Sequence, residues 1–398
     1  MNINLKTKYL IKLTLSTLIF ALILNSVNVH SQQFASNTKN RNLTKYELQE
    51  VATNSWNHYK IKFLRDDERV LDKEDDSTTS EGQSYSMLRA IMMNDKNVFD
   101  RTFNWSKKNL QIRKTDNLFA WKTRVDLHGR TFDTLTMNAT DADLDIGLAL
   151  ALADHKWSSY GNINYAQELK KLASDIYTHR VVDIMGLKVI LPFNSQQWRR
   201  IEIINPSYFN PVAYKYMANY DPEHNWNQLA QDSYRFIEWL PFQNGLMPDW
   251  VEFNYDTYAF ENYPRNLRYG EDNFGYEAFR IYYRSNLDYN VFGSLEAKKL
   301  IDNAKWFFEH EYQNHNKISA VYNKYGNPVE TYEDMTTTSA AYFIFKNTNS
   351  KFNTRLVSDK FYSKINLNKK QFNQDENYYS STWGWFALAD IADIKLIQ

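Results

Sequence analysis

The sequence predicts an all-α fold, a toroid of helical hairpins with small β-hairpins inserted between its helices. Glycine and proline are scarce, with 11 and 8 residues in a chain of 398, and this scarcity favours long helices over many short strands. Apolar residues recur at helical spacing in about a dozen segments, many of which begin near Ser, Thr or Asp. Because no Pro- or Gly-rich linker separates these segments, we expect one domain over residues 43–398.

The expected helices follow one another along the chain, and twelve helices paired as hairpins indicate the toroid. In the first half they run near Leu43 to Phe63, Glu81 to Met93, Val98 to Leu110, Asp141 to His155, Tyr165 to Ile176 and Pro211 to Met217. In the second half they run near Trp226 to Trp239, Tyr276 to Tyr289, Ser294 to Tyr312, Thr336 to Phe345, Thr354 to Tyr362 and Ser381 to Ile391. Between them, Val181 to Leu191 alternates and turns at Met185 and Gly186, which predicts a small inserted hairpin.

The first 31 residues have the pattern of an export signal. Lysines precede Leu13 to Leu24, a stretch that carries no charge. This run is about 12 residues long, whereas a membrane-spanning helix needs roughly 20. Val29 and Ser31 fit a cleavage site, and an uncleaved N-terminal anchor is the alternative. In both cases we expect a protein outside the cytoplasm, secreted or membrane-anchored, with residues 32–42 as a flexible lead-in.

The composition excludes several classes of function. A chain without cysteine has no disulfide, no thiol nucleophile and no thiolate metal site. Lys plus Arg and Asp plus Glu both number 47, so no excess of basic charge argues for a nucleic-acid partner. The signatures of metalloproteases, P-loop proteins, dinucleotide-binding proteins and serine hydrolases are missing from the sequence. We therefore expect no metal and no cofactor. A monomer is also expected, although no motif in the sequence bears on the oligomeric state.

Aromatic residues are abundant, since 28 Tyr, 24 Phe and 11 Trp make up 16% of the chain. Aromatic rings stack on the apolar faces of sugar rings and lose little conformational entropy on binding. An aromatic core explains the same composition equally well. The composition is thus compatible with a sugar-binding protein but does not select one.

The segment TTSEGQSYSMLRA contains the first candidate catalytic residue. Ser80 is the expected N-cap, and Glu81 is the first residue of the helix. Attraction to the helix dipole is a sufficient structural reason for a glutamate here. However, Gly82 permits a ligand to approach the backbone, and Tyr85 lies one turn further on the same face. As a general acid, Glu81 would need a pKa raised by burial or by a second carboxylate, which predicts a crowded, acidic cleft.

The segment NATDADLDIGLALALADHKW contains three aspartates at the start of another helix. Thr140 and Asp143 have the spacing of a capping box, which gives Asp143 a structural explanation. Asp141 and Asp145 lie four residues apart on one helical face, where like charges repel by a few tenths of a kcal/mol. We therefore expect a partner or a function that compensates for this repulsion.

Two later segments contain further acidic candidates. In GLMPDW, Asp249 stands between a helix-stopping proline and a large aromatic residue, although aspartate after proline is also common in turns. In DNFGYEAFRIYYR, which begins at Asp272, Glu277 lies near the start of a helix with Arg280 and Arg284 at the next turns. A surface ladder of salt bridges is the structural alternative for this second pattern.

Glycoside hydrolysis is the chemistry that such acidic segments fit. It needs two carboxyl groups that flank the scissile bond, one protonated and one ionised. In an inverting enzyme the two groups are roughly 6.5–9.5 Å apart, which leaves room for the attacking water. Helix starts and loops around one mouth of a toroid would bring carboxyl groups together from distant positions in the sequence.

In these acidic segments the chain resembles glycoside hydrolase family 8, which includes cellulases, lichenases, xylanases and chitosanases. SEGQSYSM and ATDADLDIGLAL are similar to its two most characteristic motifs, and NPSYFNP, GLMPDW and YEAFR extend the likeness over roughly residues 43–398. The resemblance implies an (α/α)6 barrel with a long cleft, endo-acting hydrolysis of a polysaccharide and an inverting mechanism. It implies that Glu81 is the general acid and that Asp141 binds and distorts the sugar beside the cut.

The general base is where this chain departs from the family pattern. Many members have aspartate in a Y-D-A-x-R motif, and Glu277 stands at the matching position here. The extra methylene displaces the carboxylate, and a displacement of about 1 Å is costly in catalysis. Some branches of the family take the base from elsewhere, so Asp249 is an equal candidate and Asp272 a weaker third.

The sequence also offers candidates for the sugar-binding residues and for the substrate. The candidate sugar-binding residues are Tyr85, Trp121, Tyr208, Trp250 and Arg280. The substrate is expected to be a β-glucan-type polysaccharide or the exopolysaccharide of the producer's own biofilm matrix, because related proteins are often encoded with such synthesis machinery. The alternative from a different class is a polysaccharide-binding or secretion-associated protein that kept the cleft and lost the base.

Overall fold

The computed structural model describes residues 43–126, 128–158, 161–193, 200–240, 244–261, 273–372 and 377–397. The expected export signal and lead-in, at residues 1–42, lie outside this part, as does Asp272. Within the described residues, no helix is long and apolar enough to cross a membrane.

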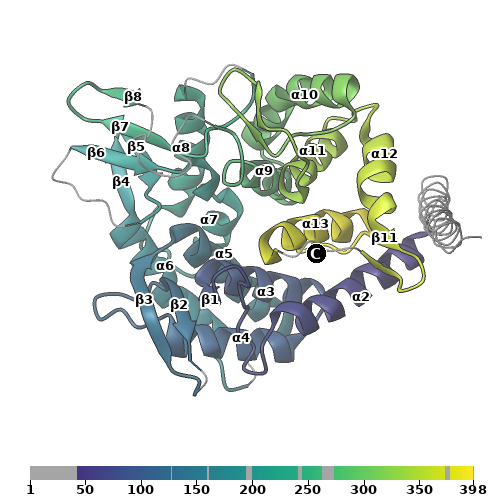
Figure 1. Ribbon diagram of the computed structural model, residues 1–398. Coiled ribbons are helices and arrows are strands. Elements are labelled where there is room, and N and C mark those ends of the chain that lie inside the picture. The colour runs from purple at the N-terminus through teal and green to yellow at the C-terminus, as the bar shows by residue number, and fades with distance from the viewer. Residues whose placement is uncertain are drawn as a thin grey trace, which may run out of the picture.

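Six helices form a closed inner ring in which each one packs on the next and the last packs on the first (Figure 1). They are α3 (Ser80–Met92), α5 (Thr140–Trp157), α7 (Pro211–Met217), α9 (Arg280–Phe292), α11 (Met335–Asn347) and α13 (Tyr378–Ile391). The inner helices are buried on nearly all sides, which is typical of helices at the centre of a large domain.

An outer layer of six helices covers this ring, and each outer helix packs on at least one inner helix. The outer helices are α2 (Lys45–Phe63), α4 (Lys96–Asn109), α6 (Tyr165–Arg180), α8 (Trp226–Trp239), α10 (Leu295–His315) and α12 (Asn353–Leu356). Helix α2 packs on α13 and thereby joins the two ends of the described chain. The predicted toroid of helical hairpins is therefore confirmed as an (α/α)6 barrel, with inner and outer helices alternating along the chain.

All strands of the described residues lie in connections that lead from an outer helix to the next inner helix. The two three-stranded antiparallel sheets are β1 (Ser77–Thr79), β2 (Ala120–Val125) and β3 (Thr131–Asn138), and β6 (Ile201–Ile204), β7 (Val251–Asn254) and β8 (Ala259–Glu261). The two-stranded hairpins pair β4 (Val181–Ile184) with β5 (Leu187–Ile190), β9 (Val321–Tyr322) with β10 (Pro328–Glu330), and β11 (Ile365–Asn366) with β12 (Gln371–Phe372). Because of their position in the chain, they surround the amino-terminal ends of the inner helices.

The inserted hairpin predicted between residues 181 and 191 is confirmed as β4 and β5. Met185 and Gly186 form its turn with positive φ angles of 53° and 82°, as a two-residue turn between right-twisted strands requires. The two three-stranded sheets were not expected. Their central strands pair with segments far away in the sequence, so alternation within one segment does not reveal them.

Three local predictions were wrong. The N-cap of α3 is Thr79, whose hydroxyl accepts the Gly82 N–H, and Ser80 is the first helical residue. Helix α9 starts at Arg280 and not at residue 276, because residues 276–279 form a turn. The segment near residues 354–362 is α-helical only at its start and continues as the π-helical turn Val357–Phe361 and the 3-10 turn Tyr362–Lys364.

Candidate active site

A cleft of about 840 Å³ opens at the amino-terminal ends of the inner helices. Its lining residues come from the starts of α3, α5 and α13 and from the connections that precede α7, α9 and α11. The positive ends of several helix dipoles therefore face this space and favour negative charge in it. Four of the acidic candidates from the sequence line the cleft: Glu81, Asp141, Asp249 and Glu277.

Glu81 is the second residue of α3 and extends from the helix into the cleft. Its Oε1 accepts a hydrogen bond of 3.1 Å from the Tyr378 hydroxyl, which lies 3.0 Å from Oγ1 of the N-cap residue Thr79. The side chain keeps 19% of its surface exposed. Glu81 is thus held by its neighbours and remains accessible to a ligand.

Gly82 does not serve ligand approach, contrary to the expectation. A Cβ atom at this position would lie 3.2 Å from the Tyr378 ring and 3.3 Å from Thr79 and from Val70. The missing side chain makes room for these protein neighbours. Gly82 thus allows Tyr378 to pack close to the start of α3 and to reach Glu81.

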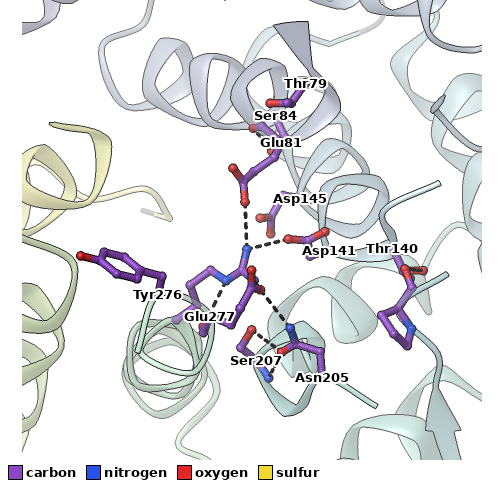
Figure 2. Close-up of polar contacts among 12 residues, drawn as sticks. Thr79, Glu81, Ser84, Thr140, Asp141, Asp145, Asn205, Ser207, Tyr276 and Glu277 are labelled. Atoms are coloured by element: carbon purple, nitrogen blue, oxygen red, sulfur yellow. Dashed lines mark hydrogen bonds and ion pairs between the residues drawn. The ribbon is translucent and has the colours of Figure 1, made fainter. Parts of the chain in front are cut away.

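Arg280 joins three carboxyl groups from distant segments, and Figure 2 shows Glu81, Asp141 and Glu277 converging on one point. Its Nη1 lies 3.0 Å from Glu81 Oε2 and 2.6 Å from Asp141 Oδ2, and its Nη2 bonds Glu277 Oε2. The guanidinium is completely buried. The expected alternative of a surface salt-bridge ladder is therefore wrong, because this arginine is the buried cation beneath the cleft.

The charge balance favours a proton on one of these carboxyl groups. Three carboxylates face a single guanidinium, so full ionisation leaves two uncompensated negative charges at a buried site. Burial raises the pKa of the Glu81 carboxyl to about 8, and the nearby Asp141 and Glu277 carboxylates raise it against the opposing effect of Arg280. Glu81 is accordingly protonated near neutral pH, as the expectation of a crowded, acidic cleft requires.

The repulsion between Asp141 and Asp145 on α5 is compensated by a matching pair of arginines on α9. Arg280 bonds Asp141, and one turn further on Arg284 Nη2 lies 3.0 Å from Asp145 Oδ2. Asn210 also donates to Asp145, at 2.9 Å. In contrast, Asp141 Oδ1 is buried and has no hydrogen-bond partner among the described residues. This oxygen is an acceptor that a bound sugar hydroxyl would satisfy.

The predicted capping box of α5 is wrong. The Thr140 hydroxyl donates to the carbonyl oxygens of Leu191 and Pro192, and the N-cap has no side-chain bond. Asp143 accepts the Phe119 N–H and the Asn138 amide, both at 2.9 Å. These residues anchor the start of α5 to neighbouring loops, which fixes the position of Asp141.

Glu277 lies in the turn before α9 and is 30% exposed to the cleft. Its Oε2 accepts bonds from Arg280 and, at 2.9 Å, from Asn205 Nδ2. Asn205 is completely buried, and its Oδ1 accepts the Ser207 N–H and hydroxyl at 3.0 and 2.7 Å. These bonds orient the Asn205 amide, so its NH₂ group faces Glu277. Among the described residues no donor bonds Glu277 Oε1, which leaves this oxygen for a ligand or water.

Asp249 supports the turn that carries Glu277. Its Oδ1 accepts the backbone N–H groups of Gly275, Glu277 and Ala278 at 3.0, 3.2 and 2.7 Å. Burial raises the pKa of Asp249 to about 7, although these bonds oppose the shift. Burial also raises the pKa of Glu277, with Arg280 and Asn205 acting in the opposite direction. Asp249 and Glu277 therefore occupy different places in the site, because Asp249 binds the backbone of the turn that carries Glu277.

The candidate sugar contacts divide into two groups. Trp121, Tyr208 and Trp250 line the cleft, and the rings of Tyr208 and Trp250 lie 5.9 Å apart. Tyr85 and Arg280 are completely buried beneath it and are not part of its lining. This placement contradicts direct sugar contact for these two, whose hydroxyl and guanidinium lie 3.4 Å apart. Sequence spacing placed Tyr85 on the face of Glu81 but did not show that α13 covers it.

Two residues of the site had no candidate role in the sequence. Asn205 belongs to the NPSYFNP segment, and Tyr378 begins the last helix. The only available signal was that both stand at the start of a helical segment, where the other cleft residues also lie.

The chain is similar to a known protein family and to several curated proteins. Residues 35–389 match the model of the glycosyl hydrolases family 8. Endoglucanase A of Acetivibrio thermocellus is 33% identical over 234 residues, which cover 58% of this chain and 46% of that protein. Endoglucanase 2 of Ruminiclostridium josui is 29% identical over 281 residues, covering 70% and 56%. The chain thus spans about half the length of these curated relatives.

Solved structures share the fold. The endoglucanase of Klebsiella pneumoniae superposes with a TM-score of 0.67 at 21% identity and covers 85% of this chain and 98% of its own. The β-1,3-1,4-glucanase of Paenibacillus sp. X4 superposes with a TM-score of 0.74 at 19% identity and covers 88% and 93%. At these identities the likeness concerns the barrel and not its substrate.

Proposed function

This chain belongs to glycosyl hydrolase family 8, and on that premise we propose that its cleft hydrolyses the glycosidic bonds of a polysaccharide with inversion of configuration. The observation that carries the proposal is the arrangement around Arg280. One buried cation holds three cleft carboxyl groups, those of Glu81, Asp141 and Glu277, of which Glu81 is protonated near neutral pH. An acid and a base that face the same space are what inverting hydrolysis requires.

Glu81 is the proposed general acid. With a pKa of about 8, its carboxyl group retains a proton at neutral pH and donates it to the departing glycosidic oxygen. The Tyr378 hydroxyl bonds Oε1 and Arg280 bonds Oε2, so the carboxyl plane is fixed before the substrate binds. After bond cleavage, Arg280 stabilises the carboxylate that remains.

Glu277 is the proposed general base. Its Oε2 is occupied by Arg280 and Asn205, so Oε1 is the oxygen that accepts a proton from the attacking water. Asp249 shapes the turn on which Glu277 stands and keeps the longer side chain in place. Asp141, with one buried unpartnered oxygen at the cleft, is the proposed residue that binds the sugar beside the cut.

The proposed substrate is a neutral or weakly charged polysaccharide, cut within the chain. The cleft lining also contains Asp72, Glu74 and Asp334, whereas its Lys122 is paired with Asp75 at 2.5 Å. Such a lining repels polyanions. Relatives described as endoglucanases support β-glucan-type polymers and internal cleavage. The producer's own exopolysaccharide is the second candidate, and the N-terminal signal pattern supports action outside the cytoplasm.

The test is the release of reducing ends from mixed-linkage β-glucan, xylan, chitosan and matrix exopolysaccharide. NMR of the first product then gives the configuration at the new anomeric centre. We expect release from at least one polymer with inverted configuration. A product of retained configuration would contradict the assignment of Glu277 as base.

The alternative function is polysaccharide binding without catalysis. It rests on the departure from the family motif, since glutamate stands where many members have the aspartate base. Binding to one of these polymers without any release of reducing ends would favour this alternative. The occupied oxygen Oε2 and the unoccupied Oε1 of Glu277 argue for a working base instead.

A further inference from the structure

A continuous sheet face leads from the catalytic acid to the edge of the molecule. In the sheet of β1, β2 and β3, Thr79 pairs with Lys122, and Lys122 pairs with Leu135. Residues directly opposite each other on neighbouring strands point to the same face of a sheet. Thr79 and Lys122 both line the cleft, so Leu135 extends the cleft surface by one more strand.

A second row runs beside the first. Arg124 lies two residues after Lys122 and therefore shares its face, and Phe132 pairs with Arg124. At Thr123 the opposite face is turned toward the protein, because Thr123 is completely buried and its hydroxyl lies 2.7 Å from that of Thr134. We call the four residues Lys122, Arg124, Phe132 and Leu135 the hairpin face. In Figure 1, β2 and β3 stand at the edge of the molecule.

The apolar side chains of the hairpin face are exposed to solvent. Phe132 is 45% exposed and Leu135 is 47% exposed. The register of β3 shifts twice against β2, and Asp133 between these two residues has a positive φ of 49°. Such bulges re-aim side chains, and here they keep Leu135 and Phe132 opposite Lys122 and Arg124. An exposed apolar pair at the end of a cleft indicates a binding surface.

We infer that the hairpin face binds a further stretch of the same polysaccharide chain, beyond the sugars held in the cleft. The inference rests on the proposed function, because it takes the cleft ligand to be a polysaccharide. A sugar ring has apolar C–H faces and hydroxyl groups at its edge. Phe132 and Leu135 offer contacts for the apolar faces, and Lys122 and Arg124 offer hydrogen-bond donors for the hydroxyl groups.

Two observations favour this occupant over a second copy of the chain. The hairpin face is continuous with the cleft through Thr79 and Lys122, so a polymer that leaves the cleft beside Glu81 passes over it. Each strand adds about 4.8 Å, so the two strands beyond β1 lengthen the track by roughly 10 Å. The cations of the face are also paired, Lys122 with Asp75 and Arg124 with Asp133, which leaves a surface with little net charge.

The test compares long and short ligands in a protein that does not need to turn over. Binding of mixed-linkage β-glucan, xylan and chitosan, each as polymer and as tetrasaccharide, is measured with the Glu81→Gln protein. We expect that adding Phe132→Ser and Leu135→Ser lowers affinity for a bound polymer by roughly fivefold more than affinity for its tetrasaccharide. The matched control adds Ile61→Ser and Leu295→Ser, two other exposed apolar residues, and leaves both affinities unchanged.

The outcomes separate this inference from the proposed function. Equal losses for polymer and tetrasaccharide, no loss for the polymer, or no polymer binding at all would overturn the hairpin face as a sugar track. Sedimentation of the wild-type protein as a dimer that the Phe132→Ser and Leu135→Ser changes dissociate would also overturn it, in favour of self-association through the open edge of β3. Absence of reducing-end release with intact polymer binding would instead overturn catalysis alone.

Discussion

The starts of α3 and α9 both present a glutamate to the cleft, but they are built in different ways. At α3, Thr79 caps the helix and Glu81 follows two residues later, so the local sequence positions the carboxyl group. At α9 there is no side-chain cap, and Glu277 stands in a turn before the first helical residue. Asp249 holds the backbone of that turn, and Asn205 and Arg280 hold the carboxylate.

The difference shows why the sequence offered one candidate for the acid but left the base open between Asp249 and Glu277. A capped helix start is encoded by adjacent residues, and its geometry follows from the helix itself. The turn before α9 depends on residues about 28 and 72 positions away in the sequence, which contribute bonds only in the folded protein. We therefore expect the two ends of the site to respond differently to substitution.

The largest effect is expected from Glu81→Gln. The amide has the same shape but donates no proton to a leaving group, so kcat should fall by roughly 10³-fold while binding of the polymer persists. Reducing-end assays and a binding isotherm measure the two quantities. Retained turnover would remove Glu81 from the role of acid.

The second prediction decides between Glu277 and Asp249. Glu277→Gln should lower kcat by roughly 10²-fold or more, because the water loses its base. Asp249→Asn should cost at most about tenfold, since the amide oxygen still accepts the three backbone N–H bonds. If Asp249→Asn is as damaging as Glu277→Gln while the protein remains folded, Asp249 is the base.

A smaller effect is expected from Asn205→Ala. Loss of the 2.9 Å bond removes one of the two donors that favour ionised Glu277, so its pKa should rise. The acidic limb of the kcat profile should then move to higher pH, and kcat should fall by about tenfold with little change in KM. The control is Asn210→Ala, another buried capping asparagine, which bonds Asp145 and should leave the acidic limb in place.

The smallest effect is expected on stability. Glu81 binds its proton with a pKa of about 8 in the folded protein, against an ordinary value of 4.5 in the unfolded chain. Between these values the folded state binds more protons, so the contribution of Glu81 to the free energy of unfolding decreases as pH rises from 4.5 toward 8. The melting temperature of the wild type relative to that of Glu81→Gln should therefore decrease from pH 5 to pH 8. A gap that does not depend on pH would argue against a raised pKa.

Much of the barrel was predictable from the sequence, because its helices are marked by apolar spacing and by the scarcity of glycine and proline. Boundaries failed where tertiary contacts overrode local pattern. The turn at residues 276–279 is one such case, since the N–H groups of residues 280–282 donate three residues back and not four as in an α-helix, while Asp249 binds the N–H groups of the turn. The three-stranded sheets are another, because their pairs are distant in sequence.

The sequence by itself determined the ring of helices, the carboxyl groups at the starts of two of them and the absence of cysteine chemistry. These features follow from residue type and spacing along one segment. Only the tertiary structure decided that Arg280 lies beneath the cleft and joins Glu81, Asp141 and Glu277. It also decided that Asp249 supports Glu277, whereas the sequence had made the two residues rival candidates for the base. The physical reason is that burial and charge pairing depend on which segments meet in space, and one-dimensional spacing does not contain that information.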